Sequence, residues 1–342
     1  LWDNEGHGSM ATRGHNDELI SQIGSSVGRR HRSRTQTKFL KKELARTGNQ
    51  SIRDKLDDLS DDEIKRMSYQ AYVKGYLRCV RGVDDNIKKM LDYLKSEGQL
   101  DNTIIIYTAD QGMFLGEHDF IDKRWMYEES LRMPFIVRYP RAIKAGTTTD
   151  ALINNTDFAP MMLEYAGVKK PKSMQGYSFR SILETRKEPP NWRTATYYRY
   201  WLHMAHHYNP AHFGIRTKEW KLIFFYGQPE KVQKQGKKKS PKSLITPPGW
   251  ELYDMKNDPH ERINLYGKSR YAKITRQLKR QLKDLRDDLG DSDEAYPHIK
   301  AVVERHWDDD LTESIRISNH LKNNAERLNS FEKSEEIKKL MK

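Results

Sequence analysis

Three residues that follow a β-branched run have the chemistry of a cation site. Asp110-Gln111-Gly112 comes directly after Thr103–Thr108, a short run that is typical of a buried strand. A carboxylate beside an amide oxygen, with a glycine that permits a sharp turn, suits a hard cation such as Ca²⁺. Two such groups do not complete a site, because Ca²⁺ takes about six to eight oxygen ligands. A turn that merely caps the strand is the alternative interpretation.

The loop that follows concentrates groups that bind anions. Residues 116–134 lead to a second apolar run, Pro134–Tyr139, and combine His118, Lys123 and Arg124 with several acids. Such a loop lies over the carboxyl edge of the sheet, where ligands bind in α/β proteins. A lysine there can donate a charge-assisted hydrogen bond to a sulfate or phosphate oxygen. The alternative is an ordinary surface lysine.

A group of histidines forms a third candidate. His203, His206, His207 and His212 lie within ten residues of aromatic sequence. Metal binding is one interpretation, although no acid or cysteine repeats at ligand spacing. Histidines of an edge strand and its loop, without a ligand, are the other.

The elements that must position these groups follow from hydrophobic periodicity. Ser60-Asp61-Asp62-Glu63 is a helix start, apolar residues recur at helical spacing to about Lys95, and Ser96-Glu97-Gly98 ends the helix. The two apolar runs then predict buried strands, and a further helix begins at Asp157, its N-cap, and ends at Gly167. Helix, strand, loop and strand in this order indicate an α/β fold.

The pattern changes to antiparallel β after about residue 190, and a helix follows over Tyr271–Leu289. Between the last two strands lies a lysine-rich insertion, Gln228–Gly249, which we interpret as solvated; contact with nucleic acid is the less favoured alternative. The expected strands are Thr194–Trp201, Phe213–Thr217, Lys221–Tyr226 and Trp250–Tyr253.

These patterns divide the chain into four expected regions. Residues 1–60 form an irregular wrapping segment, and 61–185 form part of an α/β domain with a mixed sheet flanked by helices. Residues 186–290 form a smaller antiparallel β subdomain with a packed helix, and 291–342 form a helical or partly disordered tail.

Composition bounds the possible partners. The chain has 61 Lys and Arg against 48 Asp and Glu, a net charge of +13, which attracts any polyanion, whether nucleic acid, anionic lipid or sulfated glycan. A single cysteine, Cys79, excludes an internal disulfide and a cysteine-based zinc cluster. No apolar run is long enough to cross a bilayer.

In their order along residues 60–290, these motifs resemble type I, formylglycine-dependent sulfatases of the alkaline phosphatase superfamily. The stretches that carry the resemblance are Thr108–Gly112, Leu115–His118, Asp122–Arg124, Tyr127–Pro134, Asp157–Pro160, Gly167-Val168, Met174–Gly176, Gly214–Thr217, Lys221-Leu222, Glu251–Asp254 and Asp258-Pro259.

The resemblance implies an alkaline-phosphatase-like fold and a sulfuric ester hydrolase that acts on sulfated carbohydrate, most similar to bacterial mucin-desulfating and N-acetylglucosamine-6-sulfatases. Asp110 and Gln111 match calcium ligands, and Lys123 matches the lysine that contacts the sulfate and the nucleophile. His118 matches a histidine that faces the leaving group.

The resemblance also gives the second region a role. In related sulfatases the small domain contributes contacts to the sugar, which makes substrate binding an expected role of His206, His212 and Arg216, the last also bracing the domain interface. A sulfated glycan is the implied partner, with no nucleic acid and no membrane span. The implied location is periplasmic or extracellular, although no signal peptide is visible. The residues give no oligomeric state.

One departure from the family pattern is decisive. The Cys/Ser-x-Pro-x-Arg motif, whose first residue becomes formylglycine, does not occur, and Cys79 is followed by Val80-Arg81-Gly82. The paired aspartates that complete the calcium site are also missing, so we expect the chain to be the C-terminal portion of such an enzyme. Two alternatives stay open: a phosphoester or phosphonate hydrolase of the same superfamily, and a non-catalytic fragment that binds sulfated polyanions.

The 342-residue chain on its own should have no sulfatase turnover, because it lacks the nucleophile motif. Assay of an aryl sulfate with the purified chain tests this expectation. Turnover that Lys123→Ala abolishes would contradict it.

Overall fold

The computed structural model describes residues 61–204, 209–230, 246 and 248–309. The expected wrapping segment 1–60, most of the lysine-rich insertion and residues 310–342 lie outside the described residues. The chain divides into two compact units. Among the described residues, the first unit comprises 61–105 and 113–122, and the second comprises 106–112 and the residues from 123 onward.

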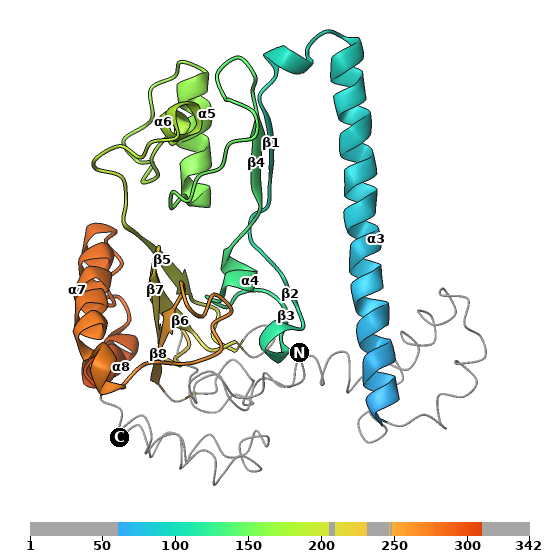
Figure 1. The fold of residues 1–342 in the computed structure, drawn as a ribbon. Coiled ribbons are helices and arrows are strands. Elements are labelled where there is room, and N and C mark those ends of the chain that lie inside the picture. Colours follow the sequence, from blue (N-terminus) through green and yellow to red (C-terminus); the bar gives the residue numbers. More distant parts are fainter. Residues whose placement is uncertain (1–60, 205–208, 231–245, 247, 310–342) are drawn as a thin grey trace. The chain divides into compact units, whose positions relative to one another are not determined.

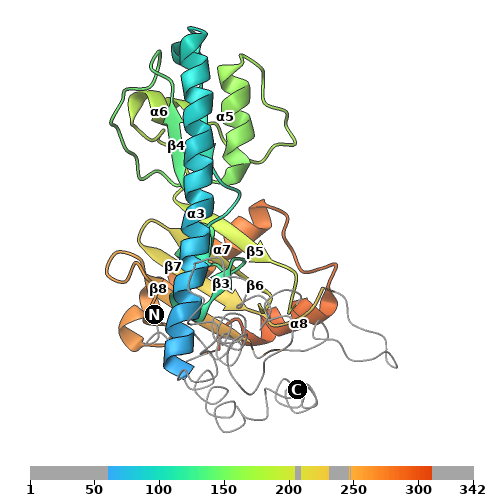
Figure 2. The same cartoon turned by 90° about the vertical axis from the view of Figure 1, so that its right-hand side faces the viewer.

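The first unit consists of a long helix and a small hairpin. Helix α3 (Asp61–Ser96) runs without interruption, as Figure 2 shows, and ends before Gly98, whose φ of 65° suits a C-terminal glycine. This confirms the predicted helix. A turn of 3₁₀ helix, η3 (Leu100–Asn102), follows it. Strands β2 (Phe114–Leu115) and β3 (Ile121–Asp122) pair antiparallel.

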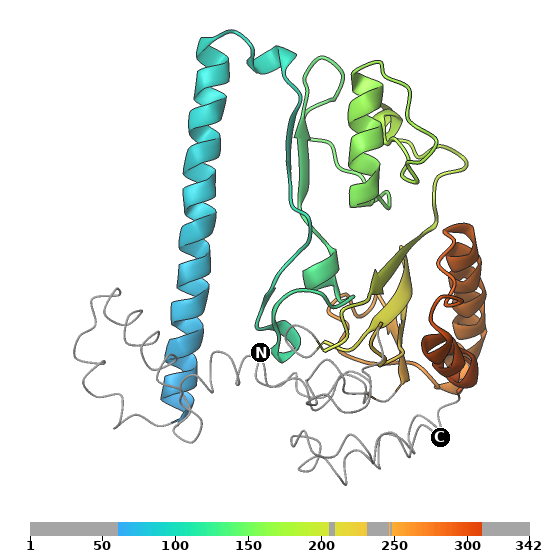
Figure 3. The same cartoon turned by 180° about the vertical axis from the view of Figure 1, so that it is seen from behind.

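Two short strands form the sheet of the second unit that carries the first candidate site. Strand β1 (Ile105–Thr108) pairs with β4 (Phe135–Arg138), so both predicted strands form, and they are neighbours in one sheet. Helices α5 (Phe158–Tyr165) and α6 (Arg180–Thr185) cover one face of this pair (Figures 1 and 3). The covered cluster includes Ile106, Phe135, Val137, Met161, Phe179 and Ile182.

The opposite face of this strand pair corrects the prediction that the two strands are buried. Ile136, between the covered Phe135 and Val137, is 64% exposed, and Tyr107 is exposed as well. Successive side chains of a strand point to opposite faces, so helices on one side leave alternate residues uncovered. Within the described residues, these strands are therefore covered by helices on one face.

Asp157 stabilises the start of α5 in a different way from the one predicted. Its side chain makes no N-cap hydrogen bond to α5. Instead its carboxylate accepts hydrogen bonds from the backbone N–H of Asn154 and of Tyr177, each at 2.7 Å, and pairs with Arg193. Asn154 and Asp157 form a capping box around the short 3₁₀ helix η5 (Asn155–Asp157) that precedes α5.

The antiparallel sheet confirms the pattern predicted after residue 190. Its strands are β5 (Ala195–Tyr200), β6 (His212–Thr217), β7 (Trp220–Phe225) and β8 (Gly249–Asp254), in the order β5-β6-β7-β8. Each neighbouring pair is antiparallel. Aromatic and branched residues fill these strands because such side chains pack well on a pleated, buried surface.

Two helices pack on this sheet. Helix α7 (Ala272–Asp288), which follows the 3₁₀ helix η7 (Ser269–Tyr271), contributes Leu278 and Leu282 to the core. Helix α8 (Pro297–His306) contributes Ile299 and Val303, although it lies in the region expected to be a tail. The part of that region up to residue 309 is thus integrated into the core of the β subdomain.

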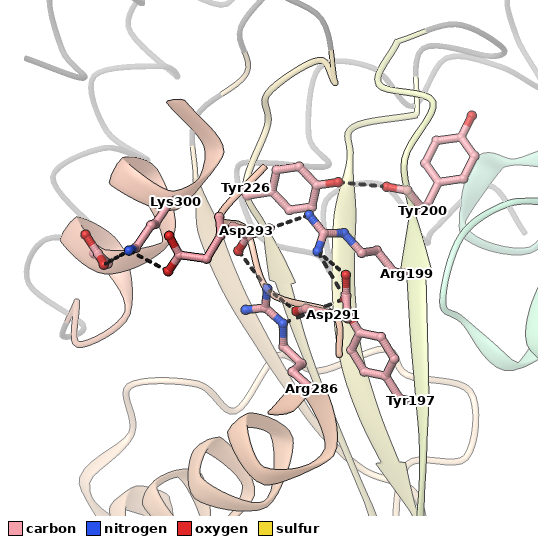
Figure 4. A network of polar contacts seen from close by, with 10 residues as sticks. Tyr197, Arg199, Tyr200, Tyr226, Arg286, Asp291, Asp293 and Lys300 are labelled. Carbon is pink, nitrogen blue, oxygen red and sulfur yellow. Dashed lines mark hydrogen bonds and ion pairs between the residues drawn. The ribbon is translucent and has the colours of Figure 1, made fainter. Parts of the chain in front are cut away.

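A buried network of charges joins the end of α7 to strand β5, as Figure 4 shows. Asp293 pairs with Arg199 at 2.7 Å and with Arg286 at 2.6 Å, while Asp291 pairs with Arg199 at 2.8 Å. The side chains of Arg199 and Asp293 are each 4% exposed. Charges removed from water in this way are tolerated only when they are paired.

Asp293→Ala should reduce the free energy of unfolding by about 3–5 kcal/mol, because it leaves two buried guanidinium groups without this partner. The matched control is Asp287→Ala, which breaks an exposed pair with Lys283 and should cost about 1 kcal/mol or less. Urea unfolding of both variants provides the measurement. Equal losses in the two variants would show that the buried network contributes no special stability.

Candidate functional site

The turn after β1 holds the proposed cation ligands. Asp110 is exposed and Gln111 is half-buried, and the Gln111 amide donates to Asp110 Oδ2 at 3.4 Å. The backbone N–H of Gly112 donates to the carbonyl oxygen of Ser130 at 2.7 Å. A Cβ atom at Gly112 would lie 2.1 Å from the Glu129 carbonyl oxygen, so only glycine permits this close approach.

Both proposed ligands line a groove of the second unit. Its volume is about 1480 Å³, and its walls include Asp110, Gln111, Glu128 and Arg216 together with residues of β4. Lys123 is not one of the lining residues. The structure therefore brings the two proposed metal ligands and Arg216 to one groove, and it places Lys123 outside that lining.

Lys123 follows β3 and is half-buried. Its carbonyl oxygen accepts a hydrogen bond from Asn209 Nδ2 at 3.2 Å. The next residue, Arg124, has a φ of 91°, a conformation that side-chain-bearing residues rarely adopt. The lysine is thus held on a backbone of unusual geometry.

His118 lies on the 3₁₀ helix η4 (Glu117–Asp119) between β2 and β3 and belongs to the first unit. It is buried, with a φ of 56°, and its ring stacks on Phe120 at 6.5 Å and meets Phe114 edge-on at 6.1 Å. Asp110, Gln111 and Lys123 belong to the second unit.

The residues expected to contact the sugar lie in environments that differ from one another. His206 lies outside the described residues. His212 is fully buried in β6, with Nδ1 2.7 Å from the carbonyl oxygen of Pro210. Strand β6 is an inner strand of the sheet, which corrects the interpretation that placed the histidines in an edge strand and its loop. The rings of Trp125 and Phe225 lie 6.0 and 4.9 Å away. Burial lowers the pKa of His212 to about 4, so its imidazole is neutral at physiological pH.

Arg216 belongs to a buried ionic network that the sequence patterns did not reveal. Its Nε lies 3.0 Å from Glu128 Oε1, on the short helix α4 (Glu128–Leu131). Lys221 of β7, fully buried, pairs with the same Glu128 oxygen at 2.8 Å and with Glu261 at 2.6 Å. Glu261 also accepts the backbone N–H of Glu128 at 2.7 Å. Arg216 therefore braces α4 against the antiparallel sheet.

A second buried acid anchors the residue just before α4. Glu251 of β8 is fully buried and accepts hydrogen bonds from Tyr127 Oη at 2.7 Å and from Tyr253 Oη at 2.9 Å. Burial and the Glu251 charge raise the pKa of Tyr127 well above its usual value, so the phenol remains a donor. Lys221 and Glu251 are charged residues within strands of aromatic and apolar residues. That position in the sequence is the one signal that could have indicated that they are buried and paired.

The ionic network separates the pKa values of its two acids. Burial disfavours the charge on Glu128, but Lys221 and Arg216 outweigh this effect and hold its pKa at about 2. Burial raises the pKa of Glu261 to about 7; Lys221 opposes this shift and the charge of Glu128 adds to it. Glu128 pairs with both Lys221 and Arg216, whereas Glu261 pairs with Lys221 alone, so burial dominates at Glu261 and this acid retains its proton more readily.

In the described part of the chain, no group of three or more His, Cys, Asp or Glu side chains could hold a metal ion. The Asp110 carboxylate and the Gln111 amide oxygen nevertheless suit Ca²⁺ in chemistry and exposure, as part of a larger set of oxygens. No helix among these residues is both long and apolar enough to cross a membrane.

Two family profiles match this chain. Residues 27–168 match the profile described as sulfatase. Residues 116–246 and 245–288 match the one described as N-sulphoglucosamine sulphohydrolase, C-terminal. The second match contains the loop of Lys123 and all four strands of the antiparallel sheet.

Curated relatives extend this similarity. An N-acetylglucosamine-6-O-sulfatase of Bacteroides thetaiotaomicron is 45% identical over 237 residues, which are 69% of this chain and 39% of the relative. A multifunctional alkaline phosphatase superfamily protein of Trinickia caryophylli is 26% identical over 71% of this chain and 44% of its own length. The chain thus spans about two-fifths of the length of these relatives.

Solved structures agree on the fold. A protein solved in complex with its substrate, D-glucosamine-2-N,6-O-disulfate, superposes with a TM-score of 0.66 at 38% identity, over 85% of this chain and 59% of that protein. A phosphonate monoester hydrolase of Silicibacter pomeroyi superposes with a TM-score of 0.53 at 23% identity, over 68% of this chain and 43% of its own length. The latter shows a shared fold only.

Glu261 should make stability depend on pH. Its folded-state pKa of about 7 lies above its usual 4.5, so folding takes up a proton at this carboxyl, and its contribution to the free energy of unfolding falls as pH rises from about 4.5 to about 7. His212, whose pKa burial lowers to about 4, gives the opposite slope over part of this window in wild type and variant alike, and Glu128 titrates below the window. Relative to the wild type, the free energy of unfolding of Glu261→Gln should therefore rise with pH across the window.

Urea unfolding between pH 4.5 and 8 measures the effect, with the exposed Glu304→Gln as control. An unchanged slope in Glu261→Gln would show that this carboxyl does not titrate in the expected window.

Proposed function

Because this chain belongs to the sulfatase family, we propose that its protein hydrolyses sulfate esters on sulfated glucosamine residues of glycans. The observation that carries the proposal is the 45% identity to an N-acetylglucosamine-6-O-sulfatase over 237 residues of this chain. The structural neighbour with a bound glucosamine disulfate supports the same class of substrate. The distant similarity to a phosphonate hydrolase favours no second activity.

Asp110 and Gln111 are the proposed calcium ligands of this chain. Their oxygens lie on a turn that the contact between Gly112 and Ser130 fixes, and they line the groove. Ca²⁺, when bound, would draw negative charge from the sulfate oxygens. The family's formylglycine nucleophile belongs to a motif that these 342 residues do not contain.

Lys123 is the proposed sulfate-binding residue. Its ammonium would donate a charge-assisted hydrogen bond to a sulfate oxygen and stabilise charge that develops there. His118 is the proposed group facing the leaving alcohol. The half-buried setting of Lys123 suits such a role, because an interaction shielded from water is stronger than one at an exposed surface.

Arg216, His212 and His206 are the other proposed contacts to the substrate, and they differ in how accessible they are. Arg216 lines the groove and also holds Glu128, so it combines a bracing role with access to the groove where substrate would lie. His212 has no exposed surface, and a substrate contact would require its surroundings to open. His206 contact with sugar, and a periplasmic or extracellular location, rest on the family resemblance alone.

Asp110→Ala and Lys123→Ala should separate the metal role from the sulfate role in the catalytically complete protein. Asp110→Ala removes one hard ligand, so raised calcium should restore part of the activity. Lys123→Ala removes a donor to the sulfate, so calcium should not restore activity; the expected loss is about 2–4 kcal/mol of transition-state stabilisation.

Steady-state rates on N-acetylglucosamine 6-sulfate across a calcium titration measure both effects. Lys172→Ala, at an exposed lysine, is the matched control and should behave as the wild type does. A wild-type protein without turnover of sulfate esters would refute the proposed function. Wild-type rates in Lys123→Ala would instead move the sulfate-binding role to another residue, with His118 the next candidate.

A further inference from the structure

The backbone around Lys123 adopts a conformation that needs outside support. Asp122 has a φ of 70° and Arg124 a φ of 91°, and neither is a glycine. Residues with a Cβ atom occupy these regions at a cost in free energy, and they persist only where surrounding contacts over-determine them. Lys123 lies between the two.

Three side chains supply that support. Asn209 Nδ2 donates to the Lys123 carbonyl oxygen at 3.2 Å, and Tyr198 Oη donates to the Arg124 carbonyl oxygen at 2.9 Å. Ser130 Oγ accepts the Arg124 backbone N–H at 2.8 Å. The three come from α4, β5 and the segment before β6, and Ser130 and Asn209 are buried.

Ser130 also reaches the other half of the candidate site. Its carbonyl oxygen accepts the N–H of Gly112, which ends the turn of Asp110 and Gln111. Its helix, α4, is held in turn by the pairs of Glu128 with Lys221 and Arg216. One residue therefore contacts the backbone of both candidate segments, and a buried ionic network fixes its helix.

We propose that Ser130, Tyr198 and Asn209 are positioning residues that hold the backbone of Lys123 and of the strained Arg124, and so direct the Lys123 ammonium at the sulfate. Ser130 additionally fixes the Asp110 turn and the Lys123 loop relative to each other, because it contacts the backbone of both. The inference rests on the proposed function for the role of Lys123, whereas the hold on the backbone rests on the contacts alone. Ser130 and Tyr198 also line the groove, but the proposed role acts through Lys123 and not through a contact with the substrate.

Tyr198→Phe tests the proposal because it removes only the hydroxyl that binds the Arg124 carbonyl. The matched control is Tyr226→Phe, which removes a hydrogen bond from a tyrosine of the same subdomain to the Tyr200 carbonyl oxygen, at 3.2 Å. Hydrogen exchange of the Lys123–Arg124 amides should quicken in Tyr198→Phe and not in Tyr226→Phe. Unchanged exchange in Tyr198→Phe would overturn the proposal whether or not the protein is active.

A double-mutant cycle tests the link to catalysis. In the catalytically complete protein, Tyr198→Phe should lower kcat about ten- to a hundredfold with little change in KM, since small misplacements of a reacting group have effects of this size. Combined with Lys123→Ala, it should cause no further loss, because the group that it positions is gone. Tyr226→Phe should leave kcat unchanged in both backgrounds.

Equal losses from Tyr198→Phe with and without Lys123 would overturn the positioning role. An effect of Lys123→Ala no larger than that of Tyr226→Phe would refute the role proposed for Lys123, and hydrogen exchange would then decide whether the three side chains hold the backbone. Ser130→Ala removes only the hydroxyl that accepts the Arg124 N–H, so exchange should quicken at Arg124. The Ser130 carbonyl oxygen still accepts the Gly112 N–H, so exchange at Gly112 and the calcium needed for half-maximal rate should not change. Tyr198→Phe should leave that calcium requirement unchanged.

Discussion

The buried ammonium of Lys221 is the interaction on which the candidate site depends. It lies in a strand of aromatic residues with no exposure to water, so its charge must be neutralised inside the protein. The two carboxylates that do so, Glu128 and Glu261, come from segments far apart in the sequence. Removing one partner of such a group is strongly destabilising. This requirement ties helix α4 to strand β7.

The position of α4 then sets the backbone of both candidate segments. Ser130, two residues after Glu128, contacts Gly112 through its carbonyl oxygen and Arg124 through its hydroxyl. Glu251 adds a second anchor through Tyr127, just before the helix. A chain of short contacts thus leads from the core of the antiparallel sheet to the turn of Asp110 and to the loop of Lys123.

The same arrangement explains why blocks that are distant in the sequence occur together in a sulfatase. The Tyr127–Pro134, Gly214–Thr217, Lys221-Leu222 and Glu251–Asp254 stretches lie in separate elements and contain no obvious catalytic motif. In the structure they meet around α4, through the contacts of Glu128, Arg216, Lys221 and Glu251. Much of what resembles the family in this chain therefore supports α4 and its neighbours, and Glu128 and Arg216 also line the groove.

The sequence by itself determined the elements, because periodicity and capping act within a few residues of each other: α3, the strands at β1 and β4, and the antiparallel strands followed from such patterns. It also gave the Asp110 turn and the loop of Lys123 as candidate segments of the site. It did not reveal that Ile136 is exposed, that His212 is buried in an inner strand, or that Lys221 is paired. The pairing of Lys221, for example, depends on a contact with Glu128, about 90 residues away in the sequence. Local composition carries no record of which distant side chain will neutralise a buried charge, so only the tertiary structure decided it.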